Sequence, residues 1–311
     1  MAKPSFWAQL FVGLNFEVRK IRRYSRGFKI SPSSIRAKIL SLAITSMVIF
    51  FFASNTPAQA AGDWQTQVRT LLKGGALVVA DQTGKPILSI NPDKPMMPAS
   101  TLKILTSAAA MDYLGPDYRF PTDFRLSTTG DLWVVGRGDP FLVSEEIEII
   151  AQLLKEKGLS KINRLILDNR FFVPNLVLDG TERTLNPYDA YNGALCVNFN
   201  TIFVQVGPGR TITSAEPQTP LTDMARELAV KSGSRGQVRL NLADSPQTCL
   251  LYAGDLIKTF LQKSGVEVRG GLEPAVTDPG QVLLFHRYAS SKTLPWLLTQ
   301  LLEYSNNFMT N

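Results

Sequence analysis

The stretch PASTLKILTSAAAMDYLGP, residues 98–116, decides how this chain is interpreted. Its apolar residues recur broadly at the spacing of one helix face, which predicts a helix over Ser100–Leu114. A proline stands just before this segment, and a glycine and a second proline stand just after it, as is typical of helix boundaries. The stretch therefore predicts a short Ala-rich helix with a serine at its start.

Ser100-Thr101-Leu102-Lys103 is an S-x-x-K tetrad at that helix start. Residues three apart share a helix face, so the hydroxyl of Ser100 and the amine of Lys103 can meet. A serine hydroxyl needs a nearby base, and lysine can be that base when burial lowers its pKa. The positive end of the helix dipole and the N–H of Ser100 also favour an oxyanion there. Taken alone, the tetrad is better interpreted as an N-capping serine beside a solvated lysine than as a catalytic pair. The surrounding sequence has to distinguish the two.

A second candidate motif, Ser305-Asn306-Asn307, stands near the end of a helix predicted over Leu294–Met309. The apolar face of that helix is expected from four leucines: Leu297, Leu298, Leu301 and Leu302. The hydroxyl of Ser305 can relay a proton, and the amide of Asn307 can bind a peptide carbonyl or the lysine. Taken alone, the motif is equally a polar helix terminus.

The other segments alternate between the helical and the strand period. A turn with a glycine links two short strands near the start of the body, which is a hairpin signal. The expected helices are Trp64–Leu72 and Ser144–Lys157, and the expected strands are Gly75–Ala80, Pro86–Ile90, Asp123–Ser127, Asp131–Val135, Arg164–Leu167 and Leu195–Val206. The block 122–285 carries no catalytic pattern of its own and is expected to be an insertion.

The positive charge of the chain belongs to its first sixty residues. The whole chain has a formal charge of +7, but residues 1–60 hold nine basic residues and one acid. The remaining 24 basic and 25 acidic residues give residues 61–311 a net charge of −1. A nucleic-acid-binding domain needs a basic face, so no nucleic acid is expected as a partner.

The leader has the order of an export signal. Basic residues precede an apolar run, Ile39–Ala53, and Ala58-Gln59-Ala60 then offers small residues for cleavage. The run is shorter than the ~20 residues of a membrane span, so cleavage is favoured over an uncleaved anchor. In both cases the body is expected outside the cytoplasm, in the periplasm, and any membrane contact is made only through the leader.

The chain has two cysteines, Cys196 and Cys249, and one histidine, His286. Export permits a disulfide, but Cys196 lies in an apolar run that is expected to be a strand, so two free, buried thiols are favoured. The cysteine spacing is not a metal pattern, and no acid cluster surrounds the histidine. No metal and no cofactor are expected.

Together these features resemble the class C low-molecular-mass penicillin-binding carboxypeptidases, the S13 peptidase family. The resemblance covers nearly all of residues 64–311. The stretches that carry it are 98–103 with the helix exit 114–120, the Gly-Arg-Gly-Asp-Pro turn 136–140, the segment 161–171, and Tyr-Ser-Asn-Asn-Phe at 304–308.

The resemblance implies an α+β fold with an incomplete transpeptidase domain of the penicillin-binding and serine β-lactamase type. Its expected parts are a leader and signal peptide (1–60), a first catalytic part (61–121), inserted β-rich accessory domains between the two motifs (122–285) and a second, truncated catalytic part (286–311).

The resemblance also implies D-Ala-D-Ala carboxypeptidase or endopeptidase activity on the stem peptides of peptidoglycan, with β-lactams as covalent inhibitors. Ser100 would be acylated, Lys103 would be the general base, and Ser305 and Asn307 would complete the cleft. In the family an Asp of the inserted part helps to bind the free amine of the stem peptide. Asp189 is its loose match here, and a turn-capping Asp is at least as good an interpretation.

One family motif does not occur: Lys-Thr-Gly on a strand that edges the cleft. The pair Lys292-Thr293 is followed by leucine and precedes the second motif, so it is no substitute. We expect one wall of the cleft to be missing and this chain to turn over little, as a truncated homologue that acts at most as a penicillin- or peptidoglycan-binding envelope protein. A β-lactamase or esterase is a weaker alternative because of the large inserted block.

Overall fold

The computed structural model describes residues 64–173, 184–242, 245–276 and 282–310. The chain divides into two compact units, Met1–Met97 and Pro98–Asn311. The predicted leader, with its apolar run and cleavage site, lies outside the described residues. Within the described ranges, no helix combines the length and the apolar character that crossing a membrane requires.

The described part of the first unit is a short helix followed by the predicted hairpin. The turn between the strands is held by the carboxylate of Asp81, which accepts the N–H groups of Thr83 and Lys85 at 2.8 and 3.0 Å. Gly84 supplies the left-handed backbone (φ +86°) that this turn requires. The elements are α3 (Trp64–Leu71), β1 (Leu77–Ala80) and β2 (Pro86–Ile90), and the two strands pair antiparallel.

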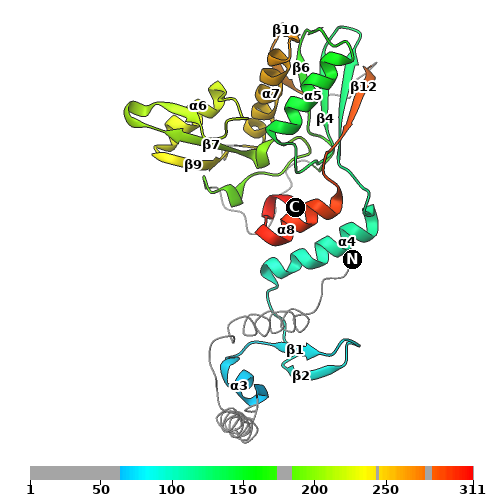
Figure 1. Ribbon diagram of the computed structural model, residues 1–311, viewed down its shortest axis with the longest axis vertical. Coiled ribbons are helices and arrows are strands. Elements are labelled where there is room, and N and C mark those ends of the chain that lie inside the picture. Colours follow the sequence, from blue (N-terminus) through cyan, green and yellow to red (C-terminus); the bar gives the residue numbers. More distant parts are fainter. Residues whose placement is uncertain (1–63, 174–183, 243–244, 277–281, 311) are drawn as a thin grey trace, which may run out of the picture. The chain divides into compact units, whose positions relative to one another are not determined.

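A mixed five-stranded sheet forms the centre of the second unit, in the order β11-β6-β4-β3-β12 (Figure 1). β4 and β11 run parallel to β6, whereas β3 runs antiparallel to both β4 and β12. The strands are β3 (Pro121–Ser127), β4 (Leu132–Gly136), β6 (Leu165–Asp168), β11 (Leu272–Pro274) and β12 (Val282–Ala289). Three of them confirm predicted strands with shifts of one or two residues.

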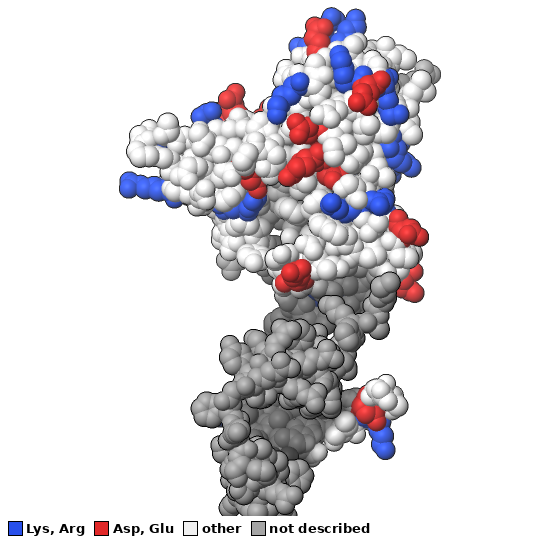
Figure 2. Space-filling view, in the orientation of Figure 1, with Lys and Arg blue, Asp and Glu red and all other residues white. Residues whose placement is uncertain are grey.

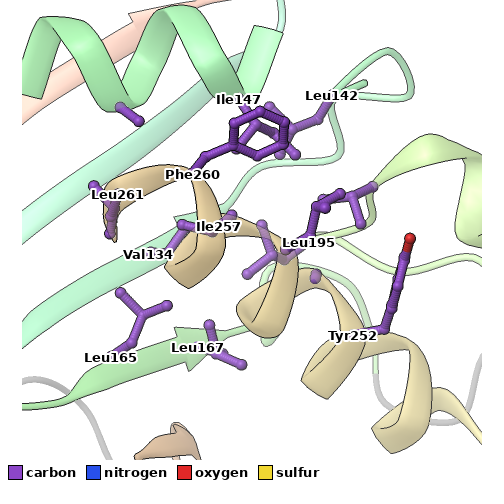
Figure 3. Close-up of a cluster of buried hydrophobic side chains, with 14 of the residues drawn as sticks. Val134, Leu142, Ile147, Leu165, Leu167, Leu195, Tyr252, Ile257, Phe260 and Leu261 are labelled. Atoms are coloured by element: carbon purple, nitrogen blue, oxygen red, sulfur yellow. The ribbon is translucent and has the colours of Figure 1, made fainter. Parts of the chain in front are cut away.

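Two helices, α5 (Ser144–Glu156) and α7 (Pro246–Lys263), lie side by side against this sheet (Figure 1). The apolar residues of α5 recur three or four positions apart and are buried, at Ile147, Ile150 and Leu154. They meet Phe260 of α7 and Leu165 of β6 in the main core, which Figure 3 shows from within.

Gly254 sets how closely α7 approaches the sheet. A Cβ at this position would lie 2.5 Å from Cδ1 of Leu167 on β6. Because a side chain does not fit there, the glycine lets the helix backbone pack directly on the strand. Ser245 caps the same helix by accepting the N–H of Thr248 at 3.1 Å, and Pro246 occupies its first turn.

A smaller antiparallel sheet with strand order β8-β7-β9 extends beside the main one (Figure 1). It carries α6, which begins at the N-cap Thr222 and ends at Gly233 in the left-handed conformation. The elements are β7 (Thr201–Val206), β8 (Ile212–Ser214), β9 (Gly236–Asn241) and α6 (Asp223–Ser232). The short remaining ones are β5 (Lys161–Ile162), β10 (Glu267–Val268), η2 (Pro187–Asp189), η3 (Asn198–Asn200) and η4 (Pro208–Arg210).

The strand predicted over Leu195–Val206 is wrong in its first half. The chain instead bends through η3, where three consecutive residues have positive φ, and β7 begins only at Thr201. The cause is a buried side-chain contact: Asn198 accepts the N–H of Ser144 and donates to its hydroxyl, both at 2.9 Å. This pair ties the bend to the start of α5.

Cys196, before this bend, is buried but lies outside any strand. Cys196 and Cys249 are both buried and do not form a disulfide, which confirms the favoured interpretation. Burial raises the pKa of the Cys196 thiol to about 12, so that thiol stays protonated and unreactive at neutral pH.

Two helices at the edge of the second unit, α4 and α8, pack against each other (Figure 1). Leu294, Leu298 and Leu301 of α8 are buried against Met111 and Leu114 of α4. A short 3₁₀ turn precedes α4, and a short helix follows α8. The bounds are η1 (Ala99–Thr101), α4 (Leu102–Leu114), α8 (Leu294–Tyr304) and α9 (Asn307–Thr310).

The single helix predicted over Leu294–Met309 is wrong, because it breaks at Ser305 and restarts at Asn307. Leu302, expected on its apolar face, is 46% exposed. The expected boundary between 285 and 286 falls inside β12, which continues to Ala289 in the five-stranded sheet. The division into catalytic and inserted parts stays a proposal.

On the face of the molecule in Figure 2, basic and acidic side chains are interspersed over the second unit. This mixture agrees with the near-zero net charge of residues 61–311.

Candidate active site

The start of α4 presents a serine and a lysine on one side of the helix. Ala99 has a φ of +45°, a left-handed value that is uncommon for a residue with a Cβ, and η1 begins there. Ser100 follows at the exposed end, and Lys103 lies one turn further on with only 5% of its surface exposed. The S-x-x-K tetrad is therefore placed at a helix start, as predicted.

The end of α8 brings the second motif to the same place. Ser305 takes a left-handed conformation (φ 50°, ψ 41°) that terminates the helix. The N–H of Asn306 donates to the carbonyl of Leu301 at 3.1 Å, and its side chain accepts the N–H of Met309 at 3.1 Å. These bonds close one helix and open the next, so Asn307 is fixed at the start of α9.

Four oxygen atoms surround Nζ of Lys103. They are the carbonyl oxygen of Ser305 at 2.6 Å, Oδ1 of Asn307 at 2.6 Å, Oγ of Ser305 at 3.0 Å and Oγ of Ser100 at 3.4 Å. Oγ of Ser305 also donates to Oγ of Ser100 at 3.0 Å. Four predicted site residues, from motifs about 200 positions apart, thus form one hydrogen-bonded cluster.

The surroundings of Lys103 make its amine easier to deprotonate than that of an exposed lysine. Burial lowers the pKa of Lys103 below its ordinary value, and the four oxygens around it belong to uncharged groups. A neutral amine keeps a lone pair that can accept the proton of Ser100. The arrangement can therefore generate a serine nucleophile.

The fifth predicted residue, Asp189, ends η2. Its carboxylate accepts the hydroxyl of Thr184, and its N–H donates to the carbonyl of Asn186 at 3.0 Å, as in a turn. Among the described residues that line the cleft next to the cluster, Tyr188 is present and Asp189 is not.

That cleft has a volume of about 530 Å³ and adjoins the cluster at Asn306 and Asn307. Its lining combines five aromatic side chains with polar ones, among which Arg239 and Glu216 form an ion pair. The aromatic residues are Phe141, Tyr188, Phe199, Tyr304 and Phe308. Periodicity did not predict this lining, because its aromatic members come from four stretches of the chain that are distant in sequence, of which only 304–308 carries a motif.

Within the described ranges, no three His, Cys, Asp or Glu side chains come together as a group that could hold a metal ion. The histidine, His286, lies on β12 opposite Phe124, and burial lowers its pKa.

The fold is similar to that of a solved penicillin-binding protein. Penicillin binding protein 4 (dacB) from Haemophilus influenzae matches with a TM-score of 0.60 and 21% identity, over 79% of this chain and 63% of that one. The same protein in complex with a β-lactam matches with a TM-score of 0.54 and 21% identity, over 79% and 62% of the two chains. The likeness places the chain in the α+β class of penicillin-binding folds.

The chain belongs to the D-Ala-D-Ala carboxypeptidase 3 (S13) family, which matches residues 69–311. This match confirms the family predicted from the motifs. A D-alanyl-D-alanine carboxypeptidase of an Actinomadura species is 27% identical over 75% of this chain, and the D-alanyl-D-alanine carboxypeptidase DacB of Haemophilus influenzae is 26% identical over 68%. The chain spans about half of the length of these relatives, 52% of each.

Proposed function

We propose that this chain carries the acylation centre of a serine-type D-Ala-D-Ala carboxypeptidase or endopeptidase that acts on the stem peptides of peptidoglycan. One observation carries the proposal: Oγ of Ser100 lies 3.4 Å from Nζ of Lys103 and 3.0 Å from Oγ of Ser305. The names of the relatives support the same reaction.

The first step is attack by Ser100. Lys103 in its free-base form, which burial favours, accepts the hydroxyl proton as Oγ bonds to the carbonyl carbon of the penultimate D-alanine. The N–H of Ser100, at the positive end of α4, supports the negative charge on the carbonyl oxygen. The C–N bond then breaks, and the leaving amine takes a proton from Lys103 through the hydroxyl of Ser305, which lies 3.0 Å from Nζ.

The second step is hydrolysis of the acyl-serine. A water molecule attacks the ester carbon, Lys103 accepts its proton, and Ser100 leaves as a hydroxyl again. Asn307 holds Nζ of Lys103 at 2.6 Å and borders the cleft, so its amide can also contact the substrate backbone. For Asp189 we keep the weaker proposal that it contacts the amine of the stem peptide from the rim of this region.

The proposed location is the periplasm, reached by way of the leader at residues 1–60. The proposed partners are peptidoglycan stem peptides, and β-lactams would acylate the same serine. In a related solved structure, the Haemophilus influenzae protein is complexed with a β-lactam.

Covalent labelling tests the proposal. The chain is incubated with a fluorescent penicillin, and release of D-alanine from a peptide that ends in D-Ala-D-Ala is measured in parallel. We expect a labelled band that disappears in Ser100→Ala and persists in Ser160→Ala, an exposed serine on another segment. Labelling that survives Ser100→Ala would falsify the assignment. Labelling without D-alanine release would instead favour the penicillin-binding protein with impaired turnover.

A further inference from the structure

A buried carboxylate on α5, outside the two motifs, forms hydrogen bonds with the segment that leads into α8. Glu146 lies in the first turn of α5 and is 4% exposed. Its oxygens accept hydrogen bonds from the hydroxyl of Tyr288 at 2.5 Å, from the N–H of Ser291 at 3.1 Å and from the hydroxyl of Ser291. A buried charge is costly unless it is well bonded, and these three donors together with the N-terminus of α5 supply that stabilisation.

The segment held in this way, Ser290–Ser291, is the first half of the four-residue link between the end of β12 at Ala289 and the start of α8 at Leu294. Ser290 is fully buried. The guanidinium of Arg119 donates to the carbonyl oxygens of both serines, and the N–H of Ser290 donates to the carbonyl of Phe120 at 2.9 Å. The link is therefore bonded on one side to α5 and on the other to the segment that follows α4.

The same segment also anchors the first turn of α8. The N–H of Leu294, the first residue of the helix, donates to the carbonyl of Tyr118 at 2.9 Å. The start of α8 is thus joined to the exit of α4, while the end of α8 meets the start of α4 at Lys103. Hydrogen bonds therefore join α4 and α8 at both ends of the pair, at the reactive cluster and at the link that contains Ser290–Ser291.

We propose that Glu146 is a positioning residue, which fixes the start of α8 and thereby sets where Ser305 stands relative to Lys103 and Ser100. The inference rests on the proposed function for its catalytic consequence, but its geometric part stands on the contacts alone. α8 has 11 residues, about 16 Å of rigid helix at 1.5 Å per residue. A small rotation at the link therefore moves the reactive hydroxyl at the other end.

The protonation state of the Tyr288 hydroxyl agrees with this role. Burial, followed by the hydrogen bond to Glu146, raises the pKa of the Tyr288 hydroxyl. The hydroxyl therefore stays protonated over the working pH range and remains a donor to the carboxylate. Glu146 itself does not belong to the cluster around Lys103, so it acts on the reaction through α8.

Two readouts test the proposal, one of which needs no catalysis. The first is the rate of acylation by a penicillin. The second is disulfide formation, in a glutathione buffer, between cysteines introduced together as Ser100→Cys and Ser305→Cys. In the parent chain the two serine Oγ atoms lie 3.0 Å apart. The native cysteines are buried.

We expect Glu146→Ala to lower both the acylation rate and the extent of disulfide formation by about tenfold or more, because a displacement of about 1 Å at a reactive group can lower a rate 10²-fold. Glu146→Gln keeps the shape and one acceptor, so it should lose less.

The matched control is Glu148→Gln, two residues along α5, where the side chain lines a separate surface groove beside Lys155 and Lys263. It should leave both readouts at the level of the parent. If Glu146→Ala lowers the unfolding temperature but leaves thiol pairing unchanged, the residue is merely structural and the proposal is overturned.

If Glu146→Ala does not fold, Glu146→Gln and Ser291→Ala carry the test with the same two readouts, and unchanged pairing in both overturns the proposal. If the parent chain is not acylated by penicillin at all, the proposed function fails, whereas slower pairing in the Glu146 variants still supports the positioning role.

Discussion

The carbonyl oxygen of Ser305 lies 2.6 Å from Nζ of Lys103, a residue 202 positions away in the sequence. This contact requires the left-handed backbone of Ser305, because a helical residue would direct its carbonyl along the axis of α8. A residue with a Cβ in this conformation is strained by roughly 1 kcal/mol or more. The strain is confined to a residue whose backbone and side chain both contact the lysine, as is common at functional sites.

The hydroxyl of Ser305 can be tested apart from its carbonyl. Ser305→Ala keeps the backbone contact with Lys103 but removes the group 3.0 Å from both Nζ of Lys103 and Oγ of Ser100. We expect the rate of acylation by a penicillin to fall by about 10²-fold, as is typical for the loss of a proton-transfer group. The unfolding temperature should change little. An acylation rate within twofold of the parent would remove the hydroxyl from the mechanism.

The protonation state of Lys103 predicts a pH dependence. Because burial lowers the pKa of Lys103 below its ordinary value of 10.5, the free base is present at a lower pH than for an exposed lysine. The acylation rate should rise with pH and level off once this lowered pKa is passed. Rates measured between about pH 6 and 10.5 give the midpoint. A midpoint at or above the ordinary value would contradict the assignment.

Lys103→Arg is the matching substitution. A guanidinium is always protonated in proteins, so it keeps the charge and donors but supplies no base. We expect the acylation rate to fall by about 10²-fold or more at every pH, without the pH-dependent rise of the parent. A parent-like pH profile in this variant would show that another group takes the proton.

The parts of the site that the sequence could predict are those whose geometry is local. The pair Ser100 and Lys103 is set by helical spacing, and the hairpin at residues 77–90 is set by its turn residues. For these, a few neighbouring residues determine the backbone. The likeness of the two motifs to a family then predicted that they meet, which periodicity alone does not require.

The parts that could not be predicted depend on partners distant in sequence. The break at Ser305 is stabilised by Lys103, and the bend at Asn198 is stabilised by Ser144 on another helix. Glu146 did leave a signal. It stands four residues before Ile150 on the apolar stripe of α5, so its burial was readable from the helical period. Its partner at residue 291 was not.

A close backbone contact next to the core gives a stability prediction. A Cβ on Gly136 would lie 2.2 Å from the carbonyl oxygen of Ala194, and a backbone atom cannot move aside as a flexible side chain can. Gly136→Ala should therefore lower the free energy of unfolding by about 3 kcal/mol, at the upper end of overpacking. Urea unfolding gives the value.

Gly271 provides the control for this substitution, since a Cβ there meets nothing within 4 Å. Gly271→Ala should leave the free energy of unfolding within about 1 kcal/mol of the parent. Equal effects of the two substitutions would mean that β4 does not approach Ala194 as closely as described.

A buried acid in the Gly-Asp-Pro turn predicts how stability depends on pH. Asp139 is 4% exposed, and burial raises the pKa of its carboxyl to about 7, an effect only partly offset by the N–H of Phe141, which donates to Oδ1 at 2.9 Å. The side chain of Ser290 also bonds to this carboxyl and lowers its pKa, but the effect of burial is the largest. The folded state therefore prefers the protonated, neutral form.

The sign of the effect follows from the raised pKa. The stability that the neutral carboxyl supplies is fully present below the ordinary pKa of 3.8 and is lost as the pH rises through about 7. The full loss is on the order of a few kcal/mol, because each pKa unit is worth about 1.4 kcal/mol. Asp139→Asn is neutral at every pH and can still accept the N–H of Phe141. Its gain in free energy of unfolding over the parent should therefore be small at pH 5, larger at pH 7 and level above that, because the loss in the parent falls between pH 3.8 and about 7.

Urea unfolding of the parent and of Asp139→Asn at pH 5, 7 and 8.5 measures this difference directly. Asp112→Asn, at an exposed position on α4, serves as the control. Its free energy of unfolding should differ from that of the parent by the same amount at all three pH values. A constant difference between Asp139→Asn and the parent across the three pH values would mean that the carboxyl does not titrate between them. In that case the turn would hold Asp139 charged, with the N–H of Phe141 and the side chain of Ser290 as the donors that stabilise the charge.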